Sequence, residues 1–129
     1  MGTISGIYEE KTIEPKTLLL GDNEFETGTL TVAAASGGGT INIQDGTVLT
    51  RDGTSGNFVP AANTSGALFV LTDHIITPIT TAGNYAVRVC ISGSVNRNLL
   101  NLGGVALTDA QADDLRKNNI LALTVHEVQ

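Results

Sequence analysis

Few residues in this chain carry the functional groups that catalysis or metal binding requires. The 129 residues include two histidines and one cysteine, with acidic residues scattered along the sequence. Asp73 and His74 are an adjacent acid and base, but neighbouring residues on an extended strand point to opposite faces. A carboxylate in that position does not orient an imidazole for general base catalysis. We therefore interpret His74 as a turn residue that bonds locally.

The other reactive side chains lack the neighbours that their chemistry needs. His126 has no second His or Cys at metal-ligand spacing. Cys90 lies between two aliphatic residues, which predicts a small buried hydrophobic residue and not an activated thiolate. Neither Ser92-Gly93-Ser94 nor Gly37-Gly38-Gly39-Thr40 fits a nucleophile elbow or a phosphate loop, and both are predicted to be turns. We expect no catalytic residue, no metal ion and no cofactor.

Composition argues against several classes of partner. The net charge is -6 and charged residues make up 16% of the chain, unlike a protein that binds nucleic acid or anionic membranes directly. Apolar runs such as 67–71 are far shorter than the ~20 residues of a membrane helix. The N-terminus has no basic start followed by an apolar stretch, so we expect synthesis in the host cytoplasm. A single cysteine forms no internal disulfide, so packing or association must supply the stability.

The elements that position these side chains are mostly strands. Aromatic residues make up 4% of the chain, and Gly and Thr are frequent, which favours strands and tight turns. From Tyr85 to Ser92, apolar and mixed positions alternate over eight residues. Further strands are predicted around 29–32, 67–71 and 120–128, and the stretch AAASGGG is predicted to be a loop.

One hairpin and one helix carry sharper local signals. Asp45-Gly46 between two alternating runs predicts a type I′ turn that pairs Gln44 with Thr47 and Ile43 with Val48. The helix begins with the capping box Thr108-Asp109-Ala110-Gln111. Basic residues at 116 and 117 complement its negative end, and two asparagines then stop it.

The first 26 residues are acidic yet rich in apolar side chains, and no helical or strand period runs through them. We predict that residues 1–27 form an extended N-terminal arm that binds a partner, and that residues 28–129 form one compact β-rich domain. The alternative is an arm folded back on its own domain. The predicted contact residues of the arm are Ile4, Ile7, Tyr8, Ile13, Pro15, Leu18, Leu19 and Leu20.

The order of elements resembles the lambda-type head decoration proteins of tailed phages. The segments that carry the likeness are DGTVLTRDGT, ALFVL, YAVRVCISGSV, TDAQADDLRKN and NILALTV, within residues 28–129. The resemblance implies a mainly β, β-clip-like domain that forms homotrimers at local threefold positions on the outer capsid surface of the virion. It also implies that N-terminal arms clasp the major capsid protein, and that the protein is structural and not an enzyme. The arm matches no family pattern, so its contacts are inferred from apolarity alone.

Two other functions stay open at this point. The loops DGTSGN and PAANTSG are rich in small polar residues, which suits a glycan-binding or adhesive module, with Phe58 and Tyr85 as candidate aromatic platforms. Trimeric dUTP pyrophosphatases share the β-clip architecture. The chain lacks their Asp-bearing Gly-Tyr motif, their Gly-Arg-Ser-Ser type phosphate loop and their glycine-rich C-terminal arm.

Overall fold

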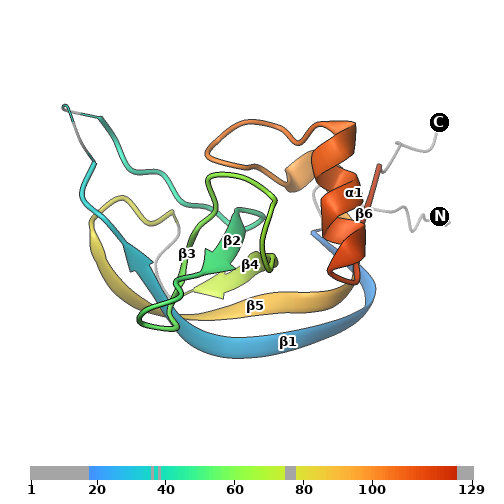
Figure 1. Ribbon diagram of the computed structural model, residues 1–129, viewed down its shortest axis with the longest axis horizontal. Helices are drawn as coiled ribbons and strands as arrows, with labels where there is room; N and C mark the ends of the chain where they lie inside the picture. Colours follow the sequence, from blue (N-terminus) through green and yellow to red (C-terminus); the bar gives the residue numbers. More distant parts are fainter. Residues whose placement is uncertain (1–17, 36, 38, 75–77, 125–129) are drawn as a thin grey trace, which may run out of the picture.

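The chain folds mainly as β-structure with one short α-helix, as the sequence predicts (Figure 1). The computed structural model describes residues 18–35, 37, 39–74 and 78–124, with positions 73 and 74 described by their backbone alone. The elements are β1 (Leu19–Val32), β2 (Val48–Arg51), β3 (Phe58–Pro60), β4 (Phe69–His74), β5 (Gly83–Asn96), the 3-10 helix η1 (Arg97–Leu99), α1 (Asp109–Lys117) and β6 (Ile120–Leu123).

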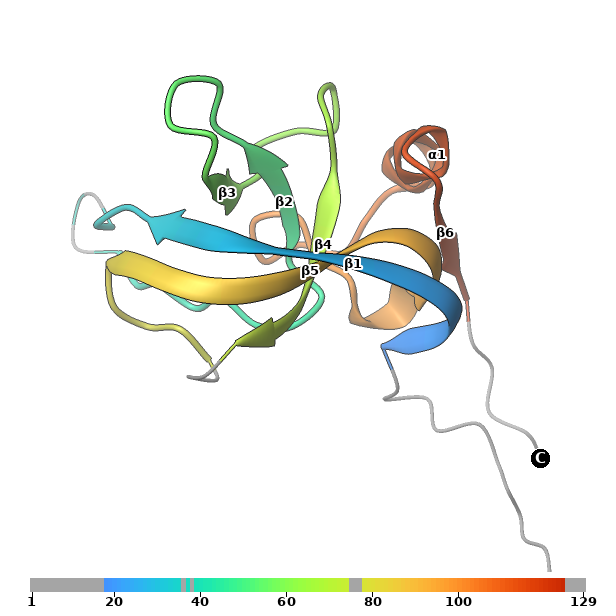
Figure 2. The same cartoon turned by 90° about the horizontal axis from the view of Figure 1, so that it is seen from below.

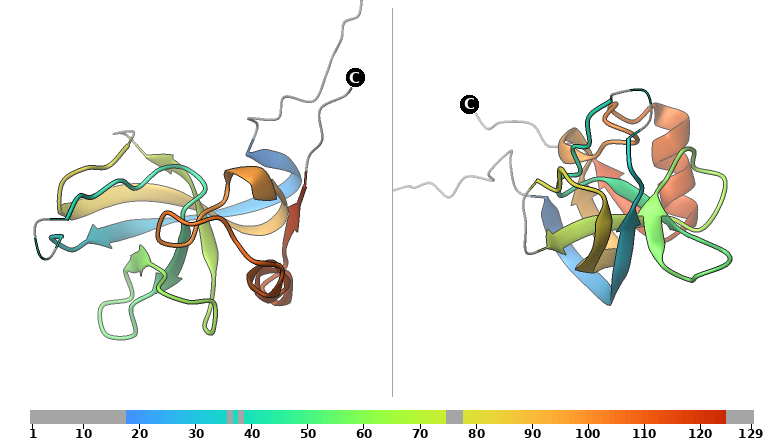
Figure 3. Two further views of the ribbon diagram at one scale, coloured as in Figure 1. Left: turned by 90° about the horizontal axis from the view of Figure 1, so that it is seen from above. Right: turned by 90° about the vertical axis from the view of Figure 1, so that its left-hand side faces the viewer.

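Two long strands organise the sheet. β1 and β5 pair antiparallel along their whole length, from Leu19 opposite Val95 to Val32 opposite Gly83. The strand order β1-β3-β2-β4-β5, together with the β1–β5 pairing, closes a five-stranded ring, which Figure 3 shows from two sides. β6 stands outside this ring and pairs in parallel with the last four residues of β5. Along one edge of β5, residues 87–90 therefore pair with β4 and residues 93–96 pair with β6.

The alternation along β5 separates two hydrophobic clusters. Val87 and Val89 point into the ring, where they pack with buried residues of the other strands. Cys90 and Val95 point to the opposite side, where the buried Leu115 of α1 covers them. The predicted strand is thus confirmed, and it extends to Asn96 because its last part is held by β1 and β6.

The turn predicted at Asp45-Gly46 forms, but the predicted pairing of the strands on either side of it is wrong. The amide of Thr47 donates to the carbonyl of Gln44 at 3.1 Å, so the turn forms. Gly46 has a φ of 94°, but Asp45 is not among the residues with positive φ, so the turn is not type I′. Ile43 pairs with Ile79, and Val48 pairs with Val70 of β4. The more apolar β4 takes the place of the local partner because it buries β2 in the core.

The segment Ser92-Gly93-Ser94, predicted to be a turn, lies within β5. Gly93 has a φ of 107°, and β1 crosses it closely enough that a Cβ atom there would lie 2.5 Å from the carbonyl oxygen of Asp22. The glycine therefore marks a close approach of two strands, not a chain reversal.

The helix matches its sequence signal. The amide of Gln111 donates to the hydroxyl of Thr108 at 3.2 Å, and the amide of Thr108 donates to the side-chain oxygen of Gln111 at 3.0 Å. Asn118 caps the C-terminal end, and Asn119 follows with a φ of 68°. The last strand is observed from Ile120 to Leu123, and the predicted continuation over 125–128 lies outside the described residues.

The predicted boundary between arm and domain after residue 27 falls inside β1 and is wrong. Residues 19–27 pair with β5, and the carbonyl of Leu18 accepts from the amide of Asn96 at 2.8 Å. Leu18 and Leu19 pack against the cluster under α1, so they contact their own domain. Register shifts between residues 19 and 25 break the alternation, which is why no strand period is visible there. Leu20 lies in β1 and is partly buried. The other predicted arm contacts, from 4 to 15, lie outside the described residues.

Candidate functional site

Cys90 is the one residue singled out for its chemistry whose side chain the structure describes. It is fully buried, and burial raises the pKa of its thiol, although a hydrogen bond from Asn23 opposes that shift. The thiol donates to the carbonyl of Ser92 at 3.0 Å. The prediction of a buried, unactivated thiol is confirmed. The backbones of Asp73 and His74 lie in β4, opposite Arg88 and Val87 of β5, so the interpretation of His74 as a turn residue is wrong. His126 lies outside the described residues.

Ionisable groups do not gather into a centre within the described part of the chain. No group of three or more His, Cys, Asp or Glu there could hold a metal ion. Charged side chains pair across the surface instead: Arg51 with Glu26 at 2.7 Å, Arg97 with Asp109 at 2.9 Å and Lys117 with Asp114 at 3.5 Å. Across the described residues, no helix has the length and apolar character to traverse a bilayer.

The polar loops use much of their hydrogen-bonding capacity internally. In the loop 52–57, the carboxylate of Asp52 accepts from the amide and the hydroxyl of Ser55, which lowers its pKa. In the loop between β3 and β4, Asn63 accepts from both groups of Ser65 in the same way. Thr64 donates to Asp114 of α1. These contacts fix the loops as turns and leave fewer groups to recognise a glycan.

Phe58 is not the surface platform that the loop position suggested. It is 1% exposed, its ring lies 5.0 Å from that of Phe69, and the guanidinium of Arg51 covers it at 4.8 Å. Tyr85 is partly buried against the cluster inside the ring, and its hydroxyl donates to the carbonyl of Thr81. Phe58 is buried in the ring because β3 pairs with β1 at this residue, with Phe58 opposite Leu30.

The end of the sheet where the chain enters β1 carries an exposed apolar edge. At this end β5 lies between β1 and β6, with Val95 opposite Leu19 on one side and Ala122 on the other (Figure 2). Within the described residues, β6 pairs with β5 alone. Leu121 and Leu123 of this strand are 38% and 41% exposed. We refer to residues 120–123 as the β6 edge.

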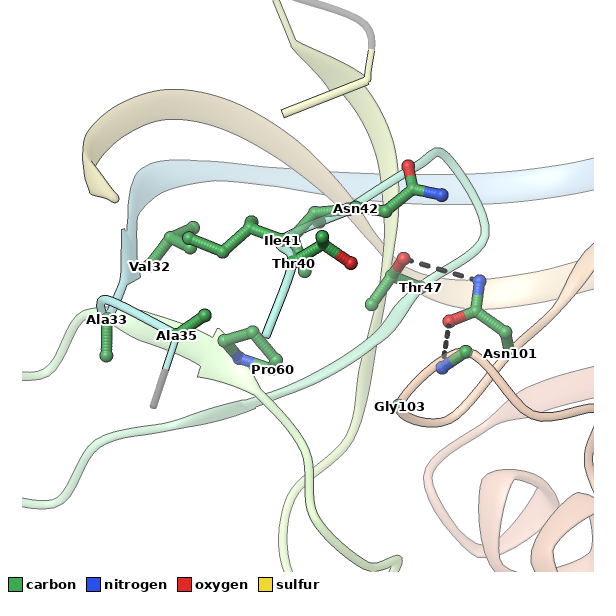
Figure 4. A pocket seen from close by; sticks show the side chains of 12 residues that line it. Val32, Ala33, Ala35, Thr40, Ile41, Asn42, Thr47, Pro60, Asn101 and Gly103 are labelled. Carbon is green, nitrogen blue, oxygen red and sulfur yellow. Dashed lines mark hydrogen bonds between the residues drawn. The ribbon is translucent and has the colours of Figure 1, made fainter. Parts of the chain in front are cut away.

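A groove lies beyond the other end of β1 (Figure 4). It has a volume of about 420 Å³, and its wall is largely apolar, with no charged side chain. Thr40, Asn42, Thr47 and Asn101 contribute its polar side chains, and the side-chain amide of Asn101 donates to the hydroxyl of Thr47 at 3.4 Å. The lining residues are Val32, Ala33, Ala35, Thr40, Ile41, Asn42, Ile43, Thr47, Pro60, Asn101, Gly103 and Gly104. They come from separate segments, so no sequence motif marks the groove.

No protein-family model matches this chain, and no curated protein matches it. The likeness to phage decoration proteins is therefore a hypothesis that depends on the order of elements in the sequence.

Proposed function

We propose that this protein is a virion structural protein that decorates and stabilises the outer surface of a phage capsid. In this proposal it binds the major capsid protein as a trimer at local threefold positions. The β-clip relationship of its fold belongs to the same proposal. The observation that supports it most is the β6 edge, an exposed apolar strand beside the point where the apolar N-terminal segment joins the domain.

An exposed strand edge is suited to binding another chain. Among the described residues, no strand pairs with the outer edge of β6. In the proposal, the N–H and C=O groups of that edge pair with a strand of the shell protein, while Leu121 and Leu123 fill pockets beside it. Arg116 and Lys117 are exposed just before β6, so this edge suits an acidic or neutral partner strand. The start of β1 and the β6 edge lie at the same end of the domain, on the two sides of Val95, so both can reach the same partner.

Leu18 and Leu19 have a different role from the one first predicted for them. They anchor the segment to the cluster under α1, so contact with the shell is assigned to residues 1–17. Those residues include Ile4, Ile7 and Ile13, whose apolar side chains suit alternate pockets along a bound strand.

Stabilisation follows from preferential binding. A ligand that binds the assembled shell but not its separated subunits stabilises the shell by about 2.7 kcal/mol per site at a hundredfold excess over Kd. Three segments on one trimer also raise the effective concentration of each, so weak individual contacts give strong attachment.

The test is cosedimentation with expanded and unexpanded phage heads. We expect the full chain to bind expanded heads preferentially, as the family resemblance implies, and deletion of residues 1–17 to abolish binding. Leu123→Lys on the β6 edge should weaken binding, whereas Thr54→Lys in the exposed loop 52–57 should not. Thermal unfolding of each variant checks that the domain is intact.

Undiminished occupancy after the deletion, or equal binding of both head forms, would count against the proposal. Release of pyrophosphate from deoxynucleoside triphosphates in the presence of Mg²⁺ would favour the enzyme alternative instead. Selective binding on a glycan array, without binding to heads, would favour the adhesive alternative.

A further inference from the structure

A rigid turn next to the groove holds an apolar side chain in solvent. Leu102 and Val105 exchange backbone hydrogen bonds of 2.9 and 3.2 Å. The two residues between them, Gly103 and Gly104, have φ values of 63° and 87°, and two positive values are what a type I′ turn requires. Val105 is 67% exposed, the highest value among the exposed large hydrophobic residues that the structure describes.

The turn and the groove form one rigid unit. The amide of Asn101 donates to the carbonyl of Gly46 at 3.0 Å, and its carbonyl accepts from the amide of Val48 at 2.9 Å. Its side-chain oxygen accepts from the amide of Gly104 at 3.1 Å (Figure 4). The turn is therefore tied to the sheet at its base and stiffened at its tip. A contact made by such a preorganised unit loses little conformational entropy on binding.

Val105 does not fill the groove of its own subunit. Gly103 and Gly104 line that groove, but the side chain of the next residue is two-thirds exposed. Each copy of the protein thus presents an apolar projection and an apolar hollow side by side. The walls of the hollow, such as Val32, Ile41 and Pro60, match a branched aliphatic side chain in polarity.

A second copy is the occupant that carries a matching apolar projection, and the charge distribution permits the contact at this site. Two copies of a chain with a net charge of -6 repel each other over most of their surface. The turn and the groove wall carry no charged residue, so copies can meet there without bringing like charges together. When the projection of one copy enters the hollow of the next, the contact is head-to-tail, and such contacts close into rings when the rotation allows.

We propose that Val105 of one copy inserts into this groove of a neighbouring copy, and that this contact holds the trimer together. The inference rests on the proposed function for two points: that three copies associate, and that they do so on a capsid shell. The contact between copies is an additional claim about these residues.

The experiment is disulfide trapping between single-substitution variants. Val105→Cys is mixed with Ala35→Cys or Thr40→Cys, two exposed positions on the groove wall, and oxidised both free and bound to expanded heads. Because the native Cys90 is fully buried, it does not compete in the folded protein. We expect a covalent pair that contains one chain of each variant. Thr54→Cys, exposed in the loop 52–57 and outside both the groove and the β6 edge, is the control and should form no pair with either groove variant.

A second measurement tests the contribution of the side chain. Val105→Asp should weaken association between copies by about tenfold or more, as for a side chain at the centre of an interface, whereas Val105→Thr keeps the shape and should lose less. Thr54→Asp should leave association between copies unchanged.

The outcomes separate this inference from the proposed function. If Val105→Cys forms no pair with the groove variants in either sample, the contact is overturned. If pairing fails but Val105→Asp abolishes binding to heads, the occupant is the shell protein, and the inference is again overturned. If pairing occurs in the free protein but the full chain does not bind heads, the contact stands and the proposed function fails.

Discussion

Replacing Gly93 of β5 by alanine should destabilise this fold more than a glycine-to-alanine change in the exposed loop 52–57. Gly93 combines two constraints: a φ of 107° and a close approach of β1. A Cβ atom there would lie 2.5 Å from the carbonyl oxygen of Asp22 and 2.7 Å from the Cα of Asn23. Both are backbone atoms, so β1 itself would have to shift. The position also joins β6 to the sheet, since the amide of Gly93 donates to the carbonyl of Asn119 at 3.0 Å.

The magnitude follows from adding the two costs. A non-glycine residue in a sparsely populated backbone region costs about 1–3 kcal/mol. Inserting a methyl group into a filled space costs about another 1–3 kcal/mol. We expect the free energy of unfolding to fall by about 2–6 kcal/mol, out of a total of roughly 5–15 kcal/mol for a typical domain. The corresponding fall in Tm is on the order of 10–20 °C.

Two other glycines separate the contributions. Gly56 has a φ of 77° but no atom within 4 Å of its added Cβ, so Gly56→Ala carries the backbone cost alone. Gly53 has neither constraint, so Gly53→Ala should be neutral or stabilise the fold by about 0.4–1 kcal/mol. The assay is urea unfolding followed by circular dichroism, with the m-value checked for each variant. If Gly93→Ala costs no more than Gly56→Ala, the close approach of β1 does not constrain the position, and the reasoning is refuted.

Three further predictions concern titration and capping. Burial raises the pKa of Cys90 above its ordinary 9.0, so the folded state loses stability as the pH rises through that range; Cys90→Ala should lack this component in urea unfolding at increasing pH. The hydrogen bond from Thr64 lowers the pKa of Asp114, so Thr64→Ala should raise it toward 3.8 in an NMR titration, and an unchanged value would contradict that cause. Thr108→Ala removes the helix cap and should lower the free energy of unfolding by about 1 kcal/mol in urea, against no more than ~0.5 kcal/mol for Thr54→Ala in the exposed loop 52–57.

The start of α1 and the strand β5 are predictable from the sequence because their signals are local. The capping box at Thr108 places its bonding groups within four residues, so the start of α1 is predictable without knowledge of the rest of the chain. The alternation from Tyr85 to Ser92 predicts β5 for a similar reason, because a strand between two apolar layers must present apolar side chains to each. The burial of Cys90 follows directly from its place in that strand.

The tertiary structure alone decided which strands meet. The sequence leaves Val48 free to pair across its nearest turn, but the fold pairs it with Val70, because burying β2 beside β4 removes more apolar surface from water. The register shifts in β1 are set by contact with β5, so residues 19–27 show no period in the sequence, and their place in the sheet is not predictable from it.

The sequence also does not show which face of β6 is exposed. In β6 both faces are apolar, and packing against α1 and β5 buries Ile120 while it leaves Leu121 and Leu123 on the surface. The groove beside Val105 draws its walls from segments far apart in the chain. Side-chain types and local hydrogen bonds depend on short stretches of the chain, so they can be predicted from the sequence. Pairing partners, exposed edges and hollows result from competition among distant segments for burial, and only the folded chain resolves that competition.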